Sequence, residues 1–201
     1  MQLARRIGAI LGAVTIAHTS QAQSINFDNV TAPCNFNQTT QLTNLYAGLG
    51  VTFGGAGGGA ILNQCGNFGI NARSGVNFLA FNTVTYATGP QEIFFAGTGN
   101  SFSLFVGARE AGSFTARAFD QSNTQIGIQT VNAAAATWTA LTLNVAGTRR
   151  IQLSSDRADW VADDLSFQQT TVIPEPHSYA LLAAGMVGLG IATRRRRRAH
   201  G

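Results

Sequence analysis

The chain has 201 residues, the length of one domain with accessory segments, and a formal net charge of +4 that comes from thirteen arginines and no lysine. Seven arginines lie at positions 5, 6 and 194–198, so segment 23–173 holds six arginines against eight acidic residues, a net charge of −2. This excludes nucleic acid as a partner of the body. The same segment contains no histidine and no lysine, which excludes Ser-His-Asp, Cys-His and Schiff-base chemistry there.

The first 22 residues have the three parts of an export signal. A basic pair at positions 5 and 6 is followed by an uncharged apolar run, 7–17, and by the small-x-small cleavage sequence Ser-Gln-Ala at 20–22. An apolar run of eleven residues is short for a bilayer, which needs about 20. We predict a signal peptide, 1–22, cleaved after Ala22. An uncleaved N-terminal anchor is the alternative.

Between residues 24 and 168, short segments of β-forming residues alternate with Gly, Asn, Ser and Thr. Predicted strands lie at 24–27, 49–53, 60–63, 68–72, 78–85, 92–96, 101–108, 113–119, 125–131, 137–145, 150–154 and 160–167. The glycine run at 54–60 lacks the Gly-Lys-Ser/Thr signature of a phosphate loop and is a turn. So many short strands predict an all-β chain, a jelly-roll-like antiparallel β-sandwich over 23–173.

Cys34 and Cys65 are the two cysteines of the chain, and both lie in the exported body. In an oxidising compartment two thiols favour one disulfide, because a structural zinc site would need four ligands. Such a bridge would contribute about 3 to 4 kcal/mol by the loop-entropy estimate. Two separate buried thiols are the alternative.

Four aspartates lie within nine residues near the end of the body: Asp156, Asp159, Asp163 and Asp164. Carboxylate oxygens suit a hard cation such as calcium. The first and last strands of a jelly roll are often neighbours, so Asp28 can approach the last strand. We therefore consider structural calcium held by Asp28, Asp163 and Asp164, with Asp164 as the leading ligand. A solvated acidic edge is the alternative.

Trp138 and Trp160 are candidate ligand contacts, because exposed aromatic rings can stack on sugars. Alternation along 137–143 places Trp138 on the face opposite Leu141 and Leu143, where solvent can reach it. Trp160 lies beside the acidic residues at the predicted end of a loop. For both rings, packing in the core or at a sheet edge is the more frequent alternative.

The remaining route to catalysis is a pair of carboxylates, as in glycosidases, held about 5 to 10 Å apart across a cleft. Asp163 and Asp164 are neighbours on a predicted strand, so their side chains are expected on opposite faces. Glu92 and Glu110 are the two glutamates of the body, and nothing in the pattern places them together. We predict that the protein is not an enzyme and has no catalytic residues.

The C-terminal segment combines an apolar span with a basic end. Residues 178–193 are sixteen uncharged residues, and they precede Arg194, Arg195, Arg196, Arg197 and Arg198. A helix of this length is about 24 Å long, short against a hydrocarbon core of about 30 Å, but flanking arginines can snorkel to the interface. We predict a single transmembrane helix with the arginines as a cytoplasmic stop signal.

The triplet Pro174, Glu175 and Pro176 precedes this span. The triplet, the apolar span and the arginine cluster, in this order over 174–201, resemble the PEP-CTERM sorting signal. The resemblance implies export in a Gram-negative bacterium and recognition by an exosortase, a membrane enzyme that cleaves near the triplet. It also implies a precursor anchored in the inner membrane and then a protein at the cell surface or in the extracellular matrix.

Segment 23–173 resembles the β-sandwich domains often found ahead of that signal. The carrying residues are Phe27-Asp28, 48–53, 118–120 and 162–167, where Asp-Asp-Leu-Ser-Phe is similar to the closing strand of carbohydrate-binding-module and MAM-type jelly rolls. This resemblance implies a fold and no particular ligand. Three functions follow in order: a sorted surface or matrix protein that binds exopolysaccharide, a structural component without a ligand, and, distantly, a carboxylate-dependent hydrolase.

Overall fold

The computed structural model describes residues 18–55, 58–80 and 90–172. The chain divides into two compact units, and the one described below is Ser20–Thr171. The predicted sorting triplet, span and arginines at 174–201 lie outside the described residues, as does most of the predicted signal peptide. Within the described ranges, no helix is long and apolar enough to cross a membrane.

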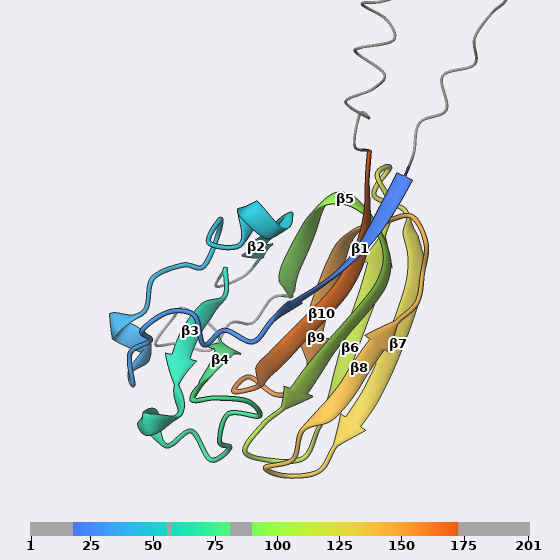
Figure 1. The fold of residues 1–201 in the computed structure, drawn as a ribbon. Coiled ribbons are helices and arrows are strands. Elements are labelled where there is room, and N and C mark those ends of the chain that lie inside the picture. The colour runs from blue at the N-terminus through green and yellow to red at the C-terminus, as the bar shows by residue number, and fades with distance from the viewer. Residues whose placement is uncertain (1–17, 56–57, 81–89, 173–201) are drawn as a thin grey trace, which may run out of the picture. The chain divides into compact units, whose positions relative to one another are not determined.

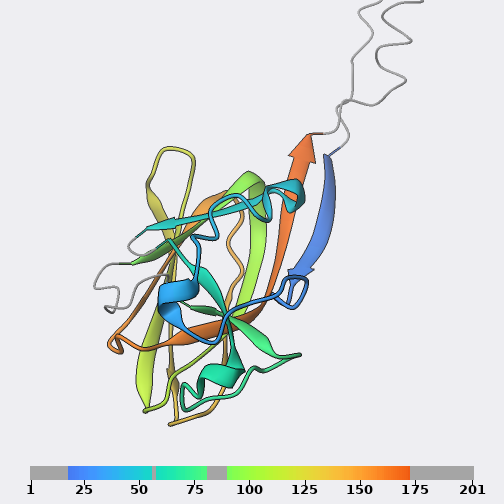
Figure 2. The same ribbon diagram turned by 90° about the vertical axis from the view of Figure 1, so that its left-hand side faces the viewer.

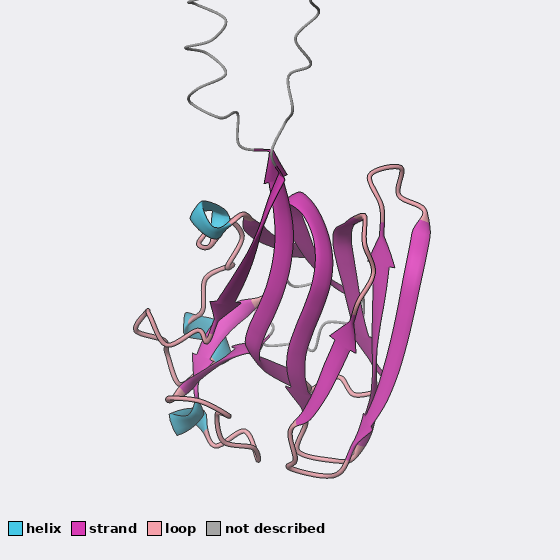
Figure 3. Cartoon of the chain, turned by 45° about the vertical axis from the view of Figure 1, so that its right-hand side comes forward, coloured by secondary structure: helices cyan, strands magenta, loops and turns pink. Residues whose placement is uncertain are grey.

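The described residues form ten strands and three short helical turns, which confirms the all-β prediction. In chain order they are β1 (His18–Ile25), η1 (Phe36–Gln38), η2 (Ala47–Leu49), β2 (Val51–Gly55), β3 (Ala60–Asn63), η3 (Gln64–Gly66), β4 (Asn77–Ala80), β5 (Gln91–Gly107), β6 (Gly112–Phe119), β7 (Gln125–Ala133), β8 (Thr139–Leu143), β9 (Thr148–Ser155) and β10 (Val161–Val172). The turns lie on one side of the strands (Figure 3). The predicted cleavage position after Ala22 falls inside β1.

The long strand β5 joins two layers into a sandwich (Figures 1 and 2). Its first part pairs with β2 and β9, and its second part pairs with β8 and β10, always antiparallel. One layer therefore runs β2-β5-β9-β6-β7 and the other β3-β4-β10-β5-β8, with β1 on β10. The β5–β9 pairing shifts register between Phe94 and Gly99. Two predicted strands, 92–96 and 101–108, are thus halves of one strand.

Alternating side chains fill the space between the layers. On β6, Phe114, Ala116 and Ala118 are buried, while the residues between them are partly exposed. On the neighbouring β9, Ile151 and Leu153 face the same core. Full burial of such an apolar side chain contributes about 1.5 to 3 kcal/mol. This period of two is why the strands were predictable from the sequence.

A second, smaller cluster lies on the outer side of β3 and β4, whose residues are buried on both faces. Its buried members are Leu62, Ile70, Phe78, Ala80 and Val161. Phe68 and Trp138 pack against it and remain partly exposed. The predicted strand at 68–72 is wrong, because Gly69 has a φ of +83° and the segment crosses over this cluster as a loop.

Candidate functional site

The disulfide between Cys34 and Cys65 is present, with 5.3 Å between the two Cα atoms. It ties the loop after β1 to η3, where the Cys65 N–H donates to the Asn63 side chain at 2.9 Å. The rings of Phe36 and Phe68 meet edge to face, with centroids 5.3 Å apart, beside this link. The bridge therefore holds together two loops that carry little regular structure.

Two of the predicted calcium ligands anchor the loop between η3 and β4. Asp163 is fully buried and accepts the backbone N–H groups of Arg73 at 2.8 Å and Ser74 at 3.2 Å. Asp28 accepts the N–H groups of Val76 at 2.9 Å and Asn77 at 3.1 Å. Two carboxylates thus bind four backbone donors in one five-residue loop.

The expectation that Asp163 and Asp164 point to opposite faces is wrong. The β5–β10 register shifts between Asp163 and Ser166, and Asp164 has a φ of 49°, so the two-residue alternation breaks at this bulge. Asp164 pairs with the guanidinium of Arg73 and accepts the hydroxyl of Ser74 at 2.6 Å. Both carboxylates therefore serve the same loop.

Burial raises the pKa of the Asp163 carboxyl to about 6, although backbone N–H groups, including that of Asp164 at 2.7 Å, act in the opposite direction. Burial, and next the charge of Asp28, raise the pKa of the Tyr46 hydroxyl to about 12. That hydroxyl donates to the side chain of Asn29 at 2.6 Å. The Tyr46 hydroxyl therefore helps to hold the loop after β1, and the Asp163 carboxyl helps to hold the 73–77 loop.

The hydrogen bonds of Asp28 and Asp163 involve the same carboxylates that are predicted to bind calcium. In the ranges that the structure describes, no three His, Cys, Asp or Glu side chains group in a way that could hold a metal ion. Three carboxylate oxygens of Asp28 and Asp163 already accept N–H groups. Structural calcium at Asp28, Asp163 and Asp164 stays a prediction.

The predicted calcium site can be tested by measuring the melting temperature of the protein with calcium and with a chelator. A structural calcium ion is expected to raise the melting temperature in calcium relative to chelator, because it binds the folded state, and to raise it less in Asp164→Asn, which lacks one ligand. Circular dichroism of the wild type and of Asp164→Asn measures it. Equal melting temperatures of the wild type in calcium and in chelator would overturn the calcium prediction.

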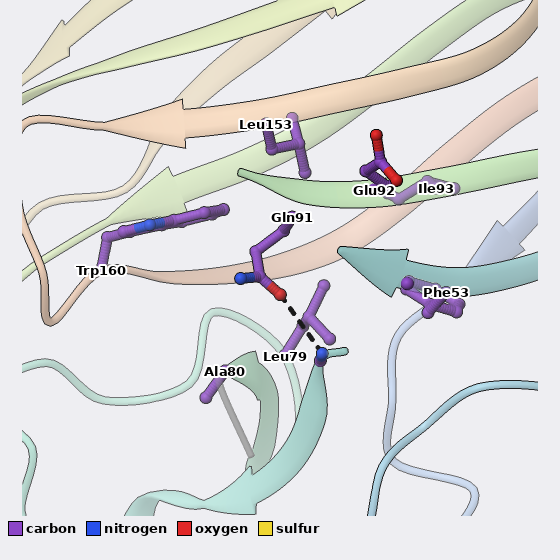
Figure 4. A pocket seen from close by; sticks show the side chains of 10 residues that line it. Phe53, Leu79, Ala80, Gln91, Glu92, Ile93, Leu153 and Trp160 are labelled. Atoms are coloured by element: carbon purple, nitrogen blue, oxygen red, sulfur yellow. Dashed lines mark hydrogen bonds between the residues drawn. The ribbon is translucent and has the colours of Figure 1, made fainter. Parts of the chain in front are cut away.

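Trp160 belongs to the core. Its side chain is 6% exposed and its ring meets that of Phe114 edge to face, with centroids 6.2 Å apart. It lines a mainly apolar pocket with Phe53, Gln91 and Leu153 (Figure 4). Gln91 accepts the N–H of Gly59 there at 3.2 Å. The pocket encloses about 10 Å³, room for about one water molecule, so Trp160 offers no surface to a large ligand.

Trp138 instead lies at the surface, just before β8. Its ring covers the second cluster, and its indole Nε1 donates to the carbonyl of Asn71 at 3.0 Å. Beside it lies an open depression of about 420 Å³, lined by Asn67, Gly69, Ile70, Asn71, Ala72, Ala136 and Trp138. The lining is uncharged, and its polar part includes two exposed asparagines. An aromatic ring is thus held rigidly at the edge of an amide-bearing hollow.

Both glutamates of the body, and two further aspartates, make contacts within the fold. Glu92 pairs with Arg150, and Glu110 pairs with Arg157. Asp120 accepts two N–H groups of its own turn, and Asp156 accepts the N–H of Ser113 at 2.8 Å. Nothing in these contacts sets two carboxylates against each other across a cleft.

Comparison with known proteins identifies the C-terminal segment. Residues 172–197 match the PEP-CTERM protein-sorting motif, which confirms the resemblance of the tail. The motif marks an exported protein that an exosortase processes. No curated protein matches the chain.

Three solved structures are similar to the body at low identity. The K2 cleaved adhesin domain of Lys-gingipain has a TM-score of 0.48 and 12% identity, covering 73% of this chain and 97% of its own. A DUF4465 family protein from Bacteroides caccae has a TM-score of 0.46 and 11% identity, over 80% and 97%. The CBM22-1 xylan-binding domain of Xyn10C from Paenibacillus barcinonensis has a TM-score of 0.42 and 12% identity, over 78% and 99%.

Proposed function

We propose that this exported, exosortase-sorted protein is a non-catalytic β-sandwich module of the cell surface or extracellular matrix that binds polysaccharide beside Trp138. The observation that carries the proposal is the half-buried indole at the rim of the 420 Å³ depression, with its Nε1 bound to the Asn71 carbonyl. A ring fixed in this way loses little conformational freedom when a sugar stacks on it. The exposed amides of Asn67 and Asn71 can bond sugar hydroxyls.

Other hollows of the described surface fit this role less well. The groove of about 490 Å³ along residues 30–45 is lined by no aromatic ring. In the hollow of about 400 Å³ beside η2, Tyr46 is buried and its hydroxyl is bonded to Asn29. In the hollow beside β1, the ring of Phe105 is covered by the Arg73 guanidinium, 3.4 Å above its centre. Trp138 therefore offers the better stacking surface.

Trp138→Ala is expected to weaken polysaccharide binding by about 30-fold, the effect of losing about 2 kcal/mol at an aromatic hot spot. Retention of the full chain on a panel of neutral and acidic polysaccharides measures it. Phe94→Ala is the matched control, since this ring is 37% exposed on β5 away from the depression.

The folding of each variant is checked by its melting temperature, because Trp138 also covers the second cluster. Asn67→Gly provides a milder test: Asn67 has a φ of 54°, which glycine adopts freely, and only the rim amide is lost. Equal retention of the wild type, Trp138→Ala and Asn67→Gly would overturn the proposed site. No retention of the wild type on any polysaccharide would favour the alternative, a structural matrix component without a ligand.

A further inference from the structure

An arginine lies at the rim of the Trp138 depression. Arg109 is exposed and follows β5 by two residues. Its side chain rests against Gly69, a lining residue: a Cβ at Gly69 would be 2.6 Å from the Nε and 2.7 Å from the Cγ of Arg109. Gly69, with its φ of +83°, therefore leaves the space in which the arginine stem lies flat along the rim.

The same end of β5 also touches the opposite wall. The N–H of Ala136, a lining residue, donates to the carbonyl of Ala108 at 3.0 Å. A Cβ at Gly107 would be 3.4 Å from Cε3 of Trp138. The backbone of Arg109 therefore lies between the two walls of the depression, next to the indole of Trp138.

Among the residues that the structure describes, no acidic side chain pairs with Arg109. The described ranges contain three ion pairs, which join Arg73 to Asp164, Arg150 to Glu92, and Arg157 to Glu110. Arg109 takes part in none of them, although the next residue, Glu110, is an acid already engaged elsewhere. The lining of the depression adds no charge of its own. An uncompensated guanidinium therefore stands beside an uncharged hollow.

We infer that Arg109 makes this site selective for acidic polysaccharides, whose uronic-acid carboxylates it binds while the sugar ring stacks on Trp138. The inference rests on the proposed function and deepens it. The guanidinium fork matches a carboxylate in two parallel hydrogen bonds, and such charge-assisted bonds are stronger than neutral ones. A neutral sugar would leave this donor group to water.

The test compares polygalacturonate and alginate with their methyl esters, which keep the sugar chain and remove its charge. The full chain is used, with Arg194–Arg198 replaced by glutamine in every sample so that the terminal arginines contribute nothing. Arg109→Gln is expected to weaken binding to the acidic chains about tenfold. It leaves binding to the methyl esters unchanged, and Arg109→Lys keeps part of the acidic preference.

Arg117→Gln is the matched control, because Arg117 on β6 takes part in no ion pair among the described residues and donates to the hydroxyl of Ser154 on β9, away from the depression. If Arg109→Gln binds the acidic chains as the wild type does, the selectivity inference is overturned. In that case a loss in Trp138→Ala still supports the binding site. If Trp138→Ala binds both forms of the chains like the wild type, the site itself is wrong.

Discussion

Replacing Cys34 and Cys65 with serine is expected to lower the free energy of unfolding by about 3 to 4 kcal/mol. The bridge spans 31 positions and links two loops that also share the Phe36–Phe68 ring contact and a hydrogen bond from the Asn63 N–H to the Pro33 carbonyl at 2.9 Å. Without it the unfolded chain regains the freedom of a loop of that length. Urea unfolding of the full chain, followed by tryptophan fluorescence, measures the change in midpoint and slope.

The reductant supplies the control for this experiment. Wild-type protein in dithiothreitol should approach the stability of the double serine variant, while the variant itself should not respond to reductant. Equal midpoints for oxidised wild type and variant would show that the bridge contributes no stability. The bridge also lies two residues before Asn67, so weaker polysaccharide binding of the reduced protein would report movement of the depression wall.

The wild type is expected to gain stability relative to Asp163→Asn as the pH falls from 7 to 4. Burial raises the pKa of Asp163 to about 6 in the folded chain, above the ordinary carboxyl value of 3.8, so the folded state binds this proton more tightly than the unfolded chain does. Its stabilising effect is full below pH 4 and is lost as the pH rises through 6. Between pH 7 and pH 4 the difference amounts to about 2.4 kcal/mol.

Asp163→Asn is the informative substitution because the amide oxygen can still accept the N–H groups of Arg73 and Ser74. It removes the titration and, at the Asp164 N–H, one hydrogen bond worth about 1 kcal/mol. Urea midpoints of both proteins at several pH values from 4 to 7 give the difference. A difference that stays constant over this range would mean that Asp163 titrates in the folded chain as it does unfolded.

Polysaccharide binding and loop anchoring are separate in this molecule. The anchors Asp28, Asp163 and Asp164 hold the 73–77 loop, whereas the depression is formed by 67–72 and the turn before β8. The two segments are adjacent in the chain. Variants of the anchors are therefore expected to change stability first, and binding only through the position of Ala72.

Much of the fold was predictable because its causes are local. Strands such as β6 and β9 alternate apolar and polar residues, and this period of two follows from the pleat itself. The prediction failed where a non-local requirement prevails. The 68–72 segment was predicted as a strand but passes over the second cluster as a loop, and β5 continues without a break between the predicted strands 92–96 and 101–108.

The sequence by itself determined the all-β class, the pairing of its two cysteines and the sorting motif, because each depends on composition or on residues adjacent in the chain. The tertiary structure alone decided which tryptophan is buried. It also decided that a bulge in β10 turns both Asp163 and Asp164 toward the 73–77 loop. It also brought Arg109 to Gly69, forty residues away. Such contacts join distant segments, and no local pattern encodes the register that creates them.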